Sequence, residues 1–239
     1  MTRKRADIVL VERGFAESRA KARAAIEAGG VRADGALVAK PSDLIGAHAE
    51  IAYAPPHPWV SRGGVKLAHA LDALKVDPAG RICLDVGAST GGFTQVLLSR
   101  GAARVYAVDV GSSQLHVSLR GDARVISLEN TDARTLTGAQ VPQAPSLVVC
   151  DASFIGAAKV LAPALRLAAT HADLVVLIKP QFEAGPGHGG VLREETARAT
   201  AQAAIDALDN LEGFRFVAAI DSPIPGGDGN LELLAHFRR

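Results

Sequence analysis

The second part of the chain, from residue 61 to the carboxyl end, alternates short apolar runs with longer amphipathic stretches. One of these runs, residues 174–178, is apolar throughout. Strands of this kind are typical of a mostly parallel sheet that is covered by helices on both faces. The pattern predicts an α/β fold with a Rossmann-like, doubly wound sheet, whose strands we place at residues 81–86, 104–109, 123–127, 147–150, 174–178, 214–220 and 232–237.

The first 53 residues have a different pattern, which predicts a small, separate α+β domain. We expect a helix at residues 6–12 and a second helix that follows the N-cap Ser18. A hairpin should then turn at Asp34 and Gly35, because this dipeptide suits the left-handed backbone of a tight turn.

Three prolines between residues 54 and 60 predict a stiff linker, which leaves residues 61–239 for the larger domain. No stretch reaches the ~20 apolar residues of a membrane span, and the amino end lacks the apolar core of a signal peptide. We therefore expect a cytoplasmic protein that does not associate with membranes.

Cysteine and histidine give little sign of redox or metal chemistry. The two cysteines, Cys83 and Cys150, each lie in an apolar run, which favours reduced core residues over a redox or metal-binding pair. The seven histidines are dispersed without ligand spacing, so no metal site is expected.

Positive charge is concentrated at the amino end, although the net charge of the chain is only +1. Arg19 and Arg23 are four residues apart on the expected second helix and share a face, which Arg32 and Lys40 would extend. Charge alone leaves an ordinary solvated face equally open. The succession of helix, basic helix, glycine turn and hairpin nevertheless resembles the S4 RNA-binding domain, which implies contacts with RNA phosphates.

A glycine-rich loop follows the first strand of the larger domain, at residues 85–94. Glycines at such a turn let the backbone approach a ligand closely, and Asp109 after the next strand is placed to accept hydrogen bonds from ribose hydroxyls. A dinucleotide oxidoreductase or a structural turn would share these features. The spacing of Gly87 and Gly91, with three residues between them, favours S-adenosylmethionine, and Asp132 after the third strand would meet its adenine end.

The residues after the fourth and fifth strands indicate which group is methylated. Asp151 is not followed by the two prolines that enzymes methylating base amino groups commonly carry, and both cysteines lie in apolar runs that make them poor nucleophiles. Lys179 follows five apolar residues, where a charge is costly unless it is paired or used. We interpret Lys179 as a base for a ribose hydroxyl, with Lys66 as a neighbouring cation. The alternative is a lysine that only forms a salt bridge.

Several ordered motifs resemble the TlyA family, whose members are FtsJ-like methyltransferases fused to an S4 domain. They lie at residues 61–67, 85–94, 107–115, 150–155, 178–185, 222–224 and 229–232. The resemblance implies S-adenosylmethionine-dependent methylation of the ribose 2′-hydroxyl of cytidine in ribosomal RNA, with ribosomal RNA or ribosomal subunits as partners. It also implies a catalytic tetrad of Lys66, Asp151, Lys179 and Glu232, in which Lys179 is the base and the others orient it and the hydroxyl.

The expected binding residues follow from the same motifs. For the cofactor we expect Asp85, Gly87, Ser89, Thr90, Gly91, Gly92, Phe93, Asp109 and Asp132. For RNA we expect Arg5, Arg19, Lys21, Arg23, Arg32, Lys40 and Arg62. Two positions depart from the family pattern, because His188 lies where a lysine is expected and Asp132 where asparagine is frequent.

Two other classes of function compete with the enzyme. A non-catalytic ribosome assembly factor would keep the basic domain but would not need two lysines and two carboxylates at strand ends. A pore-forming haemolysin would need a lipid-compatible surface, which an aromatic content of 4% does not favour.

Overall fold

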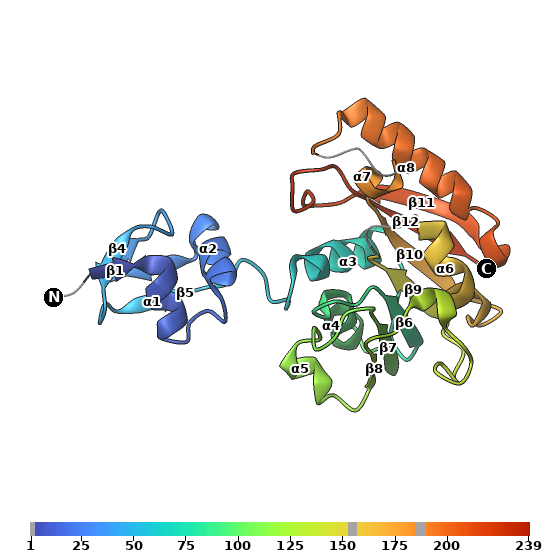
Figure 1. Ribbon diagram of the computed structural model, residues 1–239, viewed down its shortest axis with the longest axis horizontal. Helices are drawn as coiled ribbons and strands as arrows, with labels where there is room; N and C mark the ends of the chain where they lie inside the picture. Colours follow the sequence, from blue (N-terminus) through green and yellow to red (C-terminus); the bar gives the residue numbers. More distant parts are fainter. Residues whose placement is uncertain (1–2, 153–156, 185–189) are drawn as a thin grey trace. The chain divides into compact units, whose positions relative to one another are not determined.

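The computed structural model describes residues 3–152, 157–184 and 190–239 (Figure 1). The chain divides into two compact units, Met1–Pro58 and Trp59–Arg239. Among the described residues, no helix combines the length and the apolar character that crossing a membrane requires.

The described residues of the smaller unit form two helices and five short strands. A two-stranded sheet pairs β1 with β4, and a three-stranded sheet has the order β3-β2-β5. The elements are β1 (Arg3–Arg5), α1 (Ala6–Glu12), α2 (Arg19–Glu27), β2 (Val31–Ala33), β3 (Ala36–Leu37), β4 (Leu44–Gly46) and β5 (Ile51–Tyr53).

Local sequence accounts for the ends of these elements. The Ser18 side chain accepts a hydrogen bond from the Lys21 N–H at 3.3 Å and so caps α2. Asp34 and Gly35 have φ values of +51° and +78°, and they close the hairpin between β2 and β3. The expected helices and hairpin of this unit are confirmed.

The larger unit is built around a seven-stranded mixed sheet with the order β11-β12-β10-β9-β6-β7-β8. Every pairing from β10 to β8 is parallel, whereas β12 runs antiparallel to both of its neighbours. The strands are β6 (Ile82–Val86), β7 (Arg104–Val108), β8 (Val125–Leu128), β9 (Leu147–Cys150), β10 (Asp173–Ile178), β11 (Arg215–Asp221) and β12 (Leu233–Arg238).

Helices cover both faces of this sheet (Figure 1). One apolar cluster joins α3 and α4 to Cys83, Val149 and Leu177, and a second joins α6 and α8 to their strand neighbours Leu84 and Val176. Adjacent residues of one strand thus belong to different clusters, which explains why the strands are apolar throughout. The helical elements are α3 (Arg62–Ala73), α4 (Gly92–Ser99), α5 (Val117–Arg120), η1 (Ala133–Thr135), α6 (Ala157–Arg166), α7 (Pro180–Glu183), α8 (Glu194–Leu208) and η2 (Leu211–Gly213).

The expected α/β class with a doubly wound, mostly parallel sheet is confirmed. The start of the expected third strand is wrong by two residues: β8 begins at Val125 and not at residue 123. Asp122 accepts hydrogen bonds from the backbone and side chain of Arg124, and this local turn takes up the residues before the strand.

Candidate active site

The loop between β6 and α4 approaches the end of β9 closely. Gly87 has a φ of +82°, and a Cβ atom at this position would lie 3.0 Å from the backbone of Ala152. Only glycine satisfies both the left-handed backbone and the lack of space. The loop therefore forms one wall of the crevice at the carboxyl ends of the parallel strands, where open α/β sheets bind ligands.

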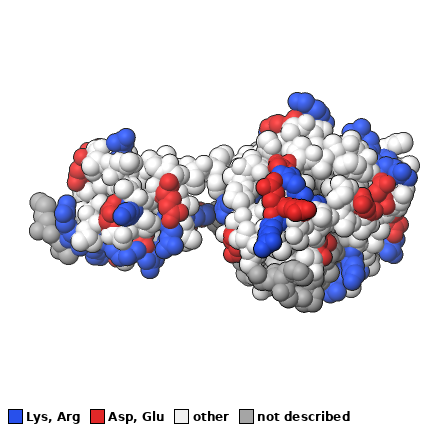
Figure 2. Space-filling view, turned by 90° about the horizontal axis from the view of Figure 1, so that it is seen from above, with Lys and Arg blue, Asp and Glu red and all other residues white. Residues whose placement is uncertain are grey.

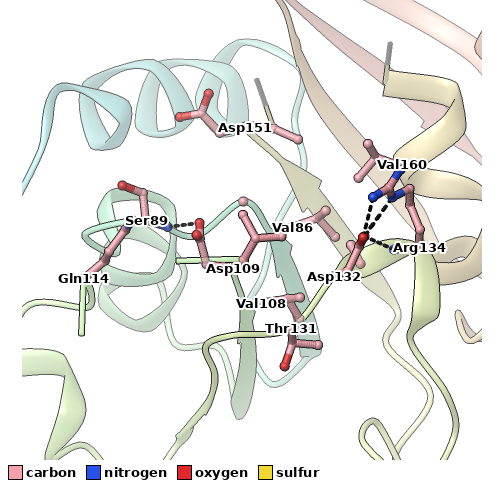
Figure 3. Close-up of a pocket in the computed structure, with 14 residues that line it drawn as sticks. Val86, Ser89, Val108, Asp109, Gln114, Thr131, Asp132, Arg134, Asp151 and Val160 are labelled. Atoms are coloured by element: carbon pink, nitrogen blue, oxygen red, sulfur yellow. Dashed lines mark hydrogen bonds and ion pairs between the residues drawn. The ribbon is translucent and has the colours of Figure 1, made fainter. Parts of the chain in front are cut away.

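Asp109, directly after β7, fixes two backbone segments of this crevice, and Figure 3 shows its contact with Ser89. Its Oδ2 accepts the Ser89 N–H at 2.8 Å, and its Oδ1 accepts the Gly111 N–H at 2.7 Å. A carboxylate oxygen can accept a second hydrogen bond, so both oxygens can still receive ligand hydroxyls.

A pocket at this edge has a volume of about 340 Å³, and its lining includes the ends of β6 and β7 and the residues directly after β9. Figure 3 shows Ser89, Gln114 and Asp109 on one side and Asp132 with Arg134 on the other. The described lining is Val86, Gly87, Ser89, Val108, Asp109, Val110, Gln114, Thr131, Asp132, Ala133, Arg134, Asp151, Ala152 and Val160.

A second, smaller pocket of about 110 Å³ adjoins the first. The two pockets share Gly87, Ser89 and Asp151 in their linings. The smaller one extends towards the start of α3, and its described lining is Ser61, Gly63, Gly87, Ala88, Ser89, Thr90, Gly92, Phe93 and Asp151. A long ligand could therefore occupy both pockets and pass Asp151 on the way.

The nine expected cofactor residues fall into three groups in the structure. Four of them line the larger pocket (Gly87, Ser89, Asp109 and Asp132), and Thr90, Gly92 and Phe93 line the smaller one. Asp85 and Gly91 are in neither described lining. A Cβ atom at Gly91 would lie 2.8 Å from Leu115 Cδ1, so this glycine serves close packing behind the loop.

Asp85 lies beneath the glycine loop and is completely buried. Its Oδ2 accepts a hydrogen bond from the Thr94 hydroxyl at 2.7 Å, while Oδ1 has no partner. Burial raises the pKa of Asp85 to about 7, against the opposite effect of Thr94. The residue therefore changes charge near neutral pH.

Asp132 is engaged by Arg134 two residues further on (Figure 3). The Arg134 backbone N–H donates to Oδ1 at 2.9 Å, and its Nη2 donates to Oδ2 at 2.6 Å. These hydrogen bonds hold the pKa of Asp132 below its usual range. Arg134 is a pocket residue that the sequence motifs did not predict, although its position two residues after an aspartate indicates such a local pair.

The four expected tetrad residues lie at the same edge of the sheet and form two ion pairs. Lys179 Nζ lies 2.6 Å from Asp151 Oδ1 and also donates to the Asp151 carbonyl oxygen at 3.1 Å. Lys66 on α3 is buried and pairs with Oε2 of the equally buried Glu232. The expected role of Lys66 as a cation near Lys179 stays a prediction, and its ion-pair partner among the described residues is Glu232.

Strand pairing explains how distant residues reach this edge. Ile178 is opposite Leu233 in the antiparallel ladder of β10 and β12, so the next residues outward, Lys179 and Glu232, lie side by side at the edge. Asp151 directly follows β9, the parallel neighbour of β10. Because β12 is antiparallel to the parallel strands, Glu232 directly before β12 lies at the edge formed by their carboxyl ends.

The two cysteines are not available as nucleophiles. Both side chains are buried and form no disulfide, and burial raises the pKa of Cys83 and of Cys150 to about 12. A thiolate is therefore strongly disfavoured near neutral pH. The expectation of reduced core cysteines is confirmed.

The basic residues of the smaller unit are partly engaged within the unit. Arg5 and Arg19 both donate to the buried carboxylate of Asp7, whose pKa they lower to about 2. Lys21 pairs with Glu17, and the Arg32 side chain donates to the Gly35 carbonyl oxygen at 3.1 Å. Figure 2 shows basic and acidic side chains interspersed on the visible face of this unit.

Arg23 and Lys40 are exposed, and their side chains have no partner among the described residues. Arg62, at the start of α3 in the larger unit, donates from Nη2 to the Pro225 carbonyl oxygen at 2.6 Å. The motif residues 153–155 and the loop residues 185–189, which include His188, lie outside the described residues.

Comparison with known proteins agrees with this geometry. Residues 59–239 match the family model of FtsJ-like methyltransferases, and residues 4–51 match that of the S4 domain. The chain is 45% identical to the 16S/23S rRNA (cytidine-2′-O)-methyltransferase TlyA of Mycobacterium tuberculosis, over 99% of this chain and 90% of that protein. The chain belongs to the TlyA family of FtsJ-like methyltransferases.

Two further similar proteins carry a different name. Hemolysin A of Brachyspira hyodysenteriae is 40% identical, over 98% of this chain and 99% of that protein. A putative hemolysin from Streptococcus thermophilus has a solved structure with a TM-score of 0.72 and 36% identity, covering 100% of this chain and 89% of that one. The family assignment and the S-adenosylmethionine-dependent methyltransferase class that the sequence predicted are confirmed.

Proposed function

We propose that this TlyA family member transfers the methyl group of S-adenosylmethionine to the ribose 2′-hydroxyl of cytidine in ribosomal RNA. The Lys179–Asp151 ion pair supports the proposal, because Asp151 lines both pockets and its Oδ1 lies 2.6 Å from Lys179 Nζ. The curated relative from Mycobacterium tuberculosis, named for this reaction, supports the choice of substrate.

The two pockets suit the cofactor. Its ribose hydroxyls would bind Asp109, whose two oxygens each retain acceptor capacity. The adenine would lie between Val110, Gln114 and Asp132 in the larger pocket, and the amino-acid part would extend towards Thr90 and Phe93 in the smaller one. When bound, S-adenosylmethionine provides an activated methyl group on a positively charged sulfur.

The tetrad would prepare the nucleophile. In the Lys179–Asp151 pair Lys179 carries a proton, which it must lose before it can remove the proton from the 2′-oxygen, and Asp151 orients the amine through the contact at 2.6 Å. The Lys66–Glu232 pair holds the neighbouring part of the edge in place without a net charge. Alignment of oxygen and methyl carbon in line provides the remaining acceleration.

The smaller unit would hold the RNA by its phosphates. Arg23 and Lys40 are the most available residues, since they are exposed and lack partners among the described residues. Arg5, Arg19, Lys21 and Arg32 of the smaller unit, and Arg62 of the larger unit, would contribute once their present partners are exchanged for phosphate oxygens.

Methyl transfer from labelled S-adenosylmethionine to separated ribosomal subunits tests the proposal. After digestion of the RNA to nucleosides, we expect the label in 2′-O-methylcytidine. Label on a base, or on the ribose of another nucleoside, would show that the substrate is wrong. Stoichiometric cofactor binding without transfer to either subunit or to free ribosomal RNA would favour the non-catalytic assembly factor.

A further inference from the structure

A carboxylate outside both described pocket linings, Glu129, organises the turn that follows Asp109. Its Oε1 accepts the backbone N–H of Gln114 at 2.6 Å and that of Leu115 at 2.9 Å. Glu129 comes directly after β8, the parallel neighbour of β7, so it lies at the same edge as Asp109.

The turn that Glu129 closes is strained. Ser113 has a φ of +54°, a left-handed conformation that residues other than glycine rarely adopt. Such a conformation persists only where the surroundings compensate its cost. The two hydrogen bonds to Glu129 directly after Ser113 provide this compensation.

Two backbone hydrogen bonds join the same segments. The Asn130 N–H donates to the Gly111 carbonyl oxygen at 2.9 Å, and the Thr131 N–H donates to that of Asp109 at 2.9 Å. Residues 109–111 and 129–131 are therefore hydrogen-bonded to each other. Glu129 attaches the turn of residues 112–116 to this pair of segments.

This turn contacts the cofactor pocket and the glycine loop. The Gln114 side chain lines the larger pocket (Figure 3). The His116 N–H donates to the Thr90 carbonyl oxygen at 3.1 Å, and Leu115 packs against Gly91. A shift of the turn would therefore move both the adenine side of the pocket and the loop that forms its wall.

The charge of Glu129 is maintained by its surroundings. The Leu115 N–H and the neighbouring amides lower the pKa of Glu129, and the positive charge of Arg120 acts in the same direction. Arg120 also donates from Nε to the Leu115 carbonyl oxygen at 2.7 Å, so both backbone polar groups of Leu115 are held.

We infer that Glu129 is a positioning residue for the cofactor, which it does not touch, because it fixes the turn that presents Gln114 and supports the glycine loop. The inference rests on the proposed use of these pockets by S-adenosylmethionine. It predicts that loss of Glu129 weakens cofactor binding and leaves the rate at saturating cofactor nearly unchanged.

The test compares cofactor affinity in full-length variants by calorimetry, with S-adenosylmethionine and S-adenosylhomocysteine as ligands. Glu129→Ala should raise both dissociation constants roughly ten- to hundredfold, since two hydrogen bonds to a charged group are lost. Glu129→Gln should stay within about threefold of the wild type, because an amide oxygen can still accept both N–H groups. Asp122→Ala is the matched control, since Asp122 accepts hydrogen bonds from the backbone and side chain of Arg124 and so holds a different turn.

A second substitution separates positioning from general damage. Ser113→Gly in the Glu129→Ala background should recover part of the affinity, because glycine adopts the left-handed conformation without strain. Steady-state kinetics should show a raised KM for the cofactor with kcat changed less than about threefold, which loss of fold would not produce. If Glu129→Ala does not fold, Glu129→Asp, which keeps the charge but withdraws the oxygen, should show an intermediate loss.

Equal affinities of the wild type and Glu129→Ala, or a loss confined to kcat, would overturn the inference while leaving the proposed function intact. Failure of the wild type itself to bind S-adenosylmethionine would instead contradict the proposed function.

Discussion

At the scale of single residues, the proposed active site balances its charges in pairs. Lys179 contacts Asp151 and Lys66 contacts Glu232, so two buried or half-buried lysines bring no net charge into the crevice. Removing one partner of such a pair is costly, because the other charge stays without compensation. The sequence predicted that these four residues lie at one edge of the sheet, but it could not predict how they pair, because the pair of Lys66 and Glu232 depends on the direction of β12.

Asp85 should make the stability of the protein depend on pH. Its folded-state pKa of about 7 lies above the usual 3.8, so the folded protein favours the protonated acid. The stability that this proton contributes is complete below the usual value and is lost as the pH rises through about 7. Asp85→Asn, which imitates the neutral form, should therefore gain stability over the wild type as the pH rises.

Chemical denaturation of the wild type and Asp85→Asn between pH 4 and pH 8 measures this effect. The difference in free energy of unfolding should be small at the acidic end and should grow by a few kcal/mol towards pH 8. A difference that stays constant over the range would show that Asp85 is ionised throughout.

At the scale of elements, the alternation of apolar strands and helices was sufficient to predict the sheet. The positions of strand ends were less certain, because local turns such as that of Asp122 and Arg124 compete with the strand pattern. The sequence also predicted the glycine loop, but not the turn that Glu129 holds, because the partners of this carboxylate are backbone groups and carry no sequence signal.

Close packing of α3 against α4 positions part of the tetrad. A Cβ atom at Gly92 would collide with Ser61 Oγ and would lie 3.0 Å from the Gly64 nitrogen, at the start of the helix that carries Lys66. Gly92→Ala should therefore lower the free energy of unfolding by about 1–3 kcal/mol and reduce methyl transfer.

Gly138→Ala is the control for this substitution, since a Cβ atom there meets nothing within 4 Å. Its stability should stay within about 0.5 kcal/mol of the wild type. Thermal or chemical unfolding curves that place both variants at the same midpoint would contradict the packing argument.

At the scale of the whole molecule, the net charge of +1 does not show that the two units have different proposed roles. The smaller unit offers exposed cations, while the larger unit contains the pockets proposed for the cofactor and the proposed tetrad. Charge reversal in the smaller unit should therefore change RNA affinity without changing cofactor affinity.

Arg23→Glu combined with Lys40→Glu tests this difference in roles in the full-length protein. The double variant should bind ribosomal RNA more weakly, and the slope of log K against log salt should fall by about 1 for each lost phosphate contact. Its affinity for S-adenosylmethionine should equal that of the wild type. Lys75→Glu, a charge reversal at an exposed position of the larger unit, is the control, and an equal loss of RNA affinity in this variant would show that the effect is not local.

The most direct test of the central claim is the rate of methyl transfer by Lys179→Ala, measured together with its cofactor affinity and with Lys75→Ala as control. We predict that Lys179→Ala binds S-adenosylmethionine normally and forms 2′-O-methylcytidine about 10²- to 10⁴-fold more slowly, as expected for the loss of a general base. A Lys179→Ala protein that binds the cofactor and methylates at the wild-type rate would contradict the account.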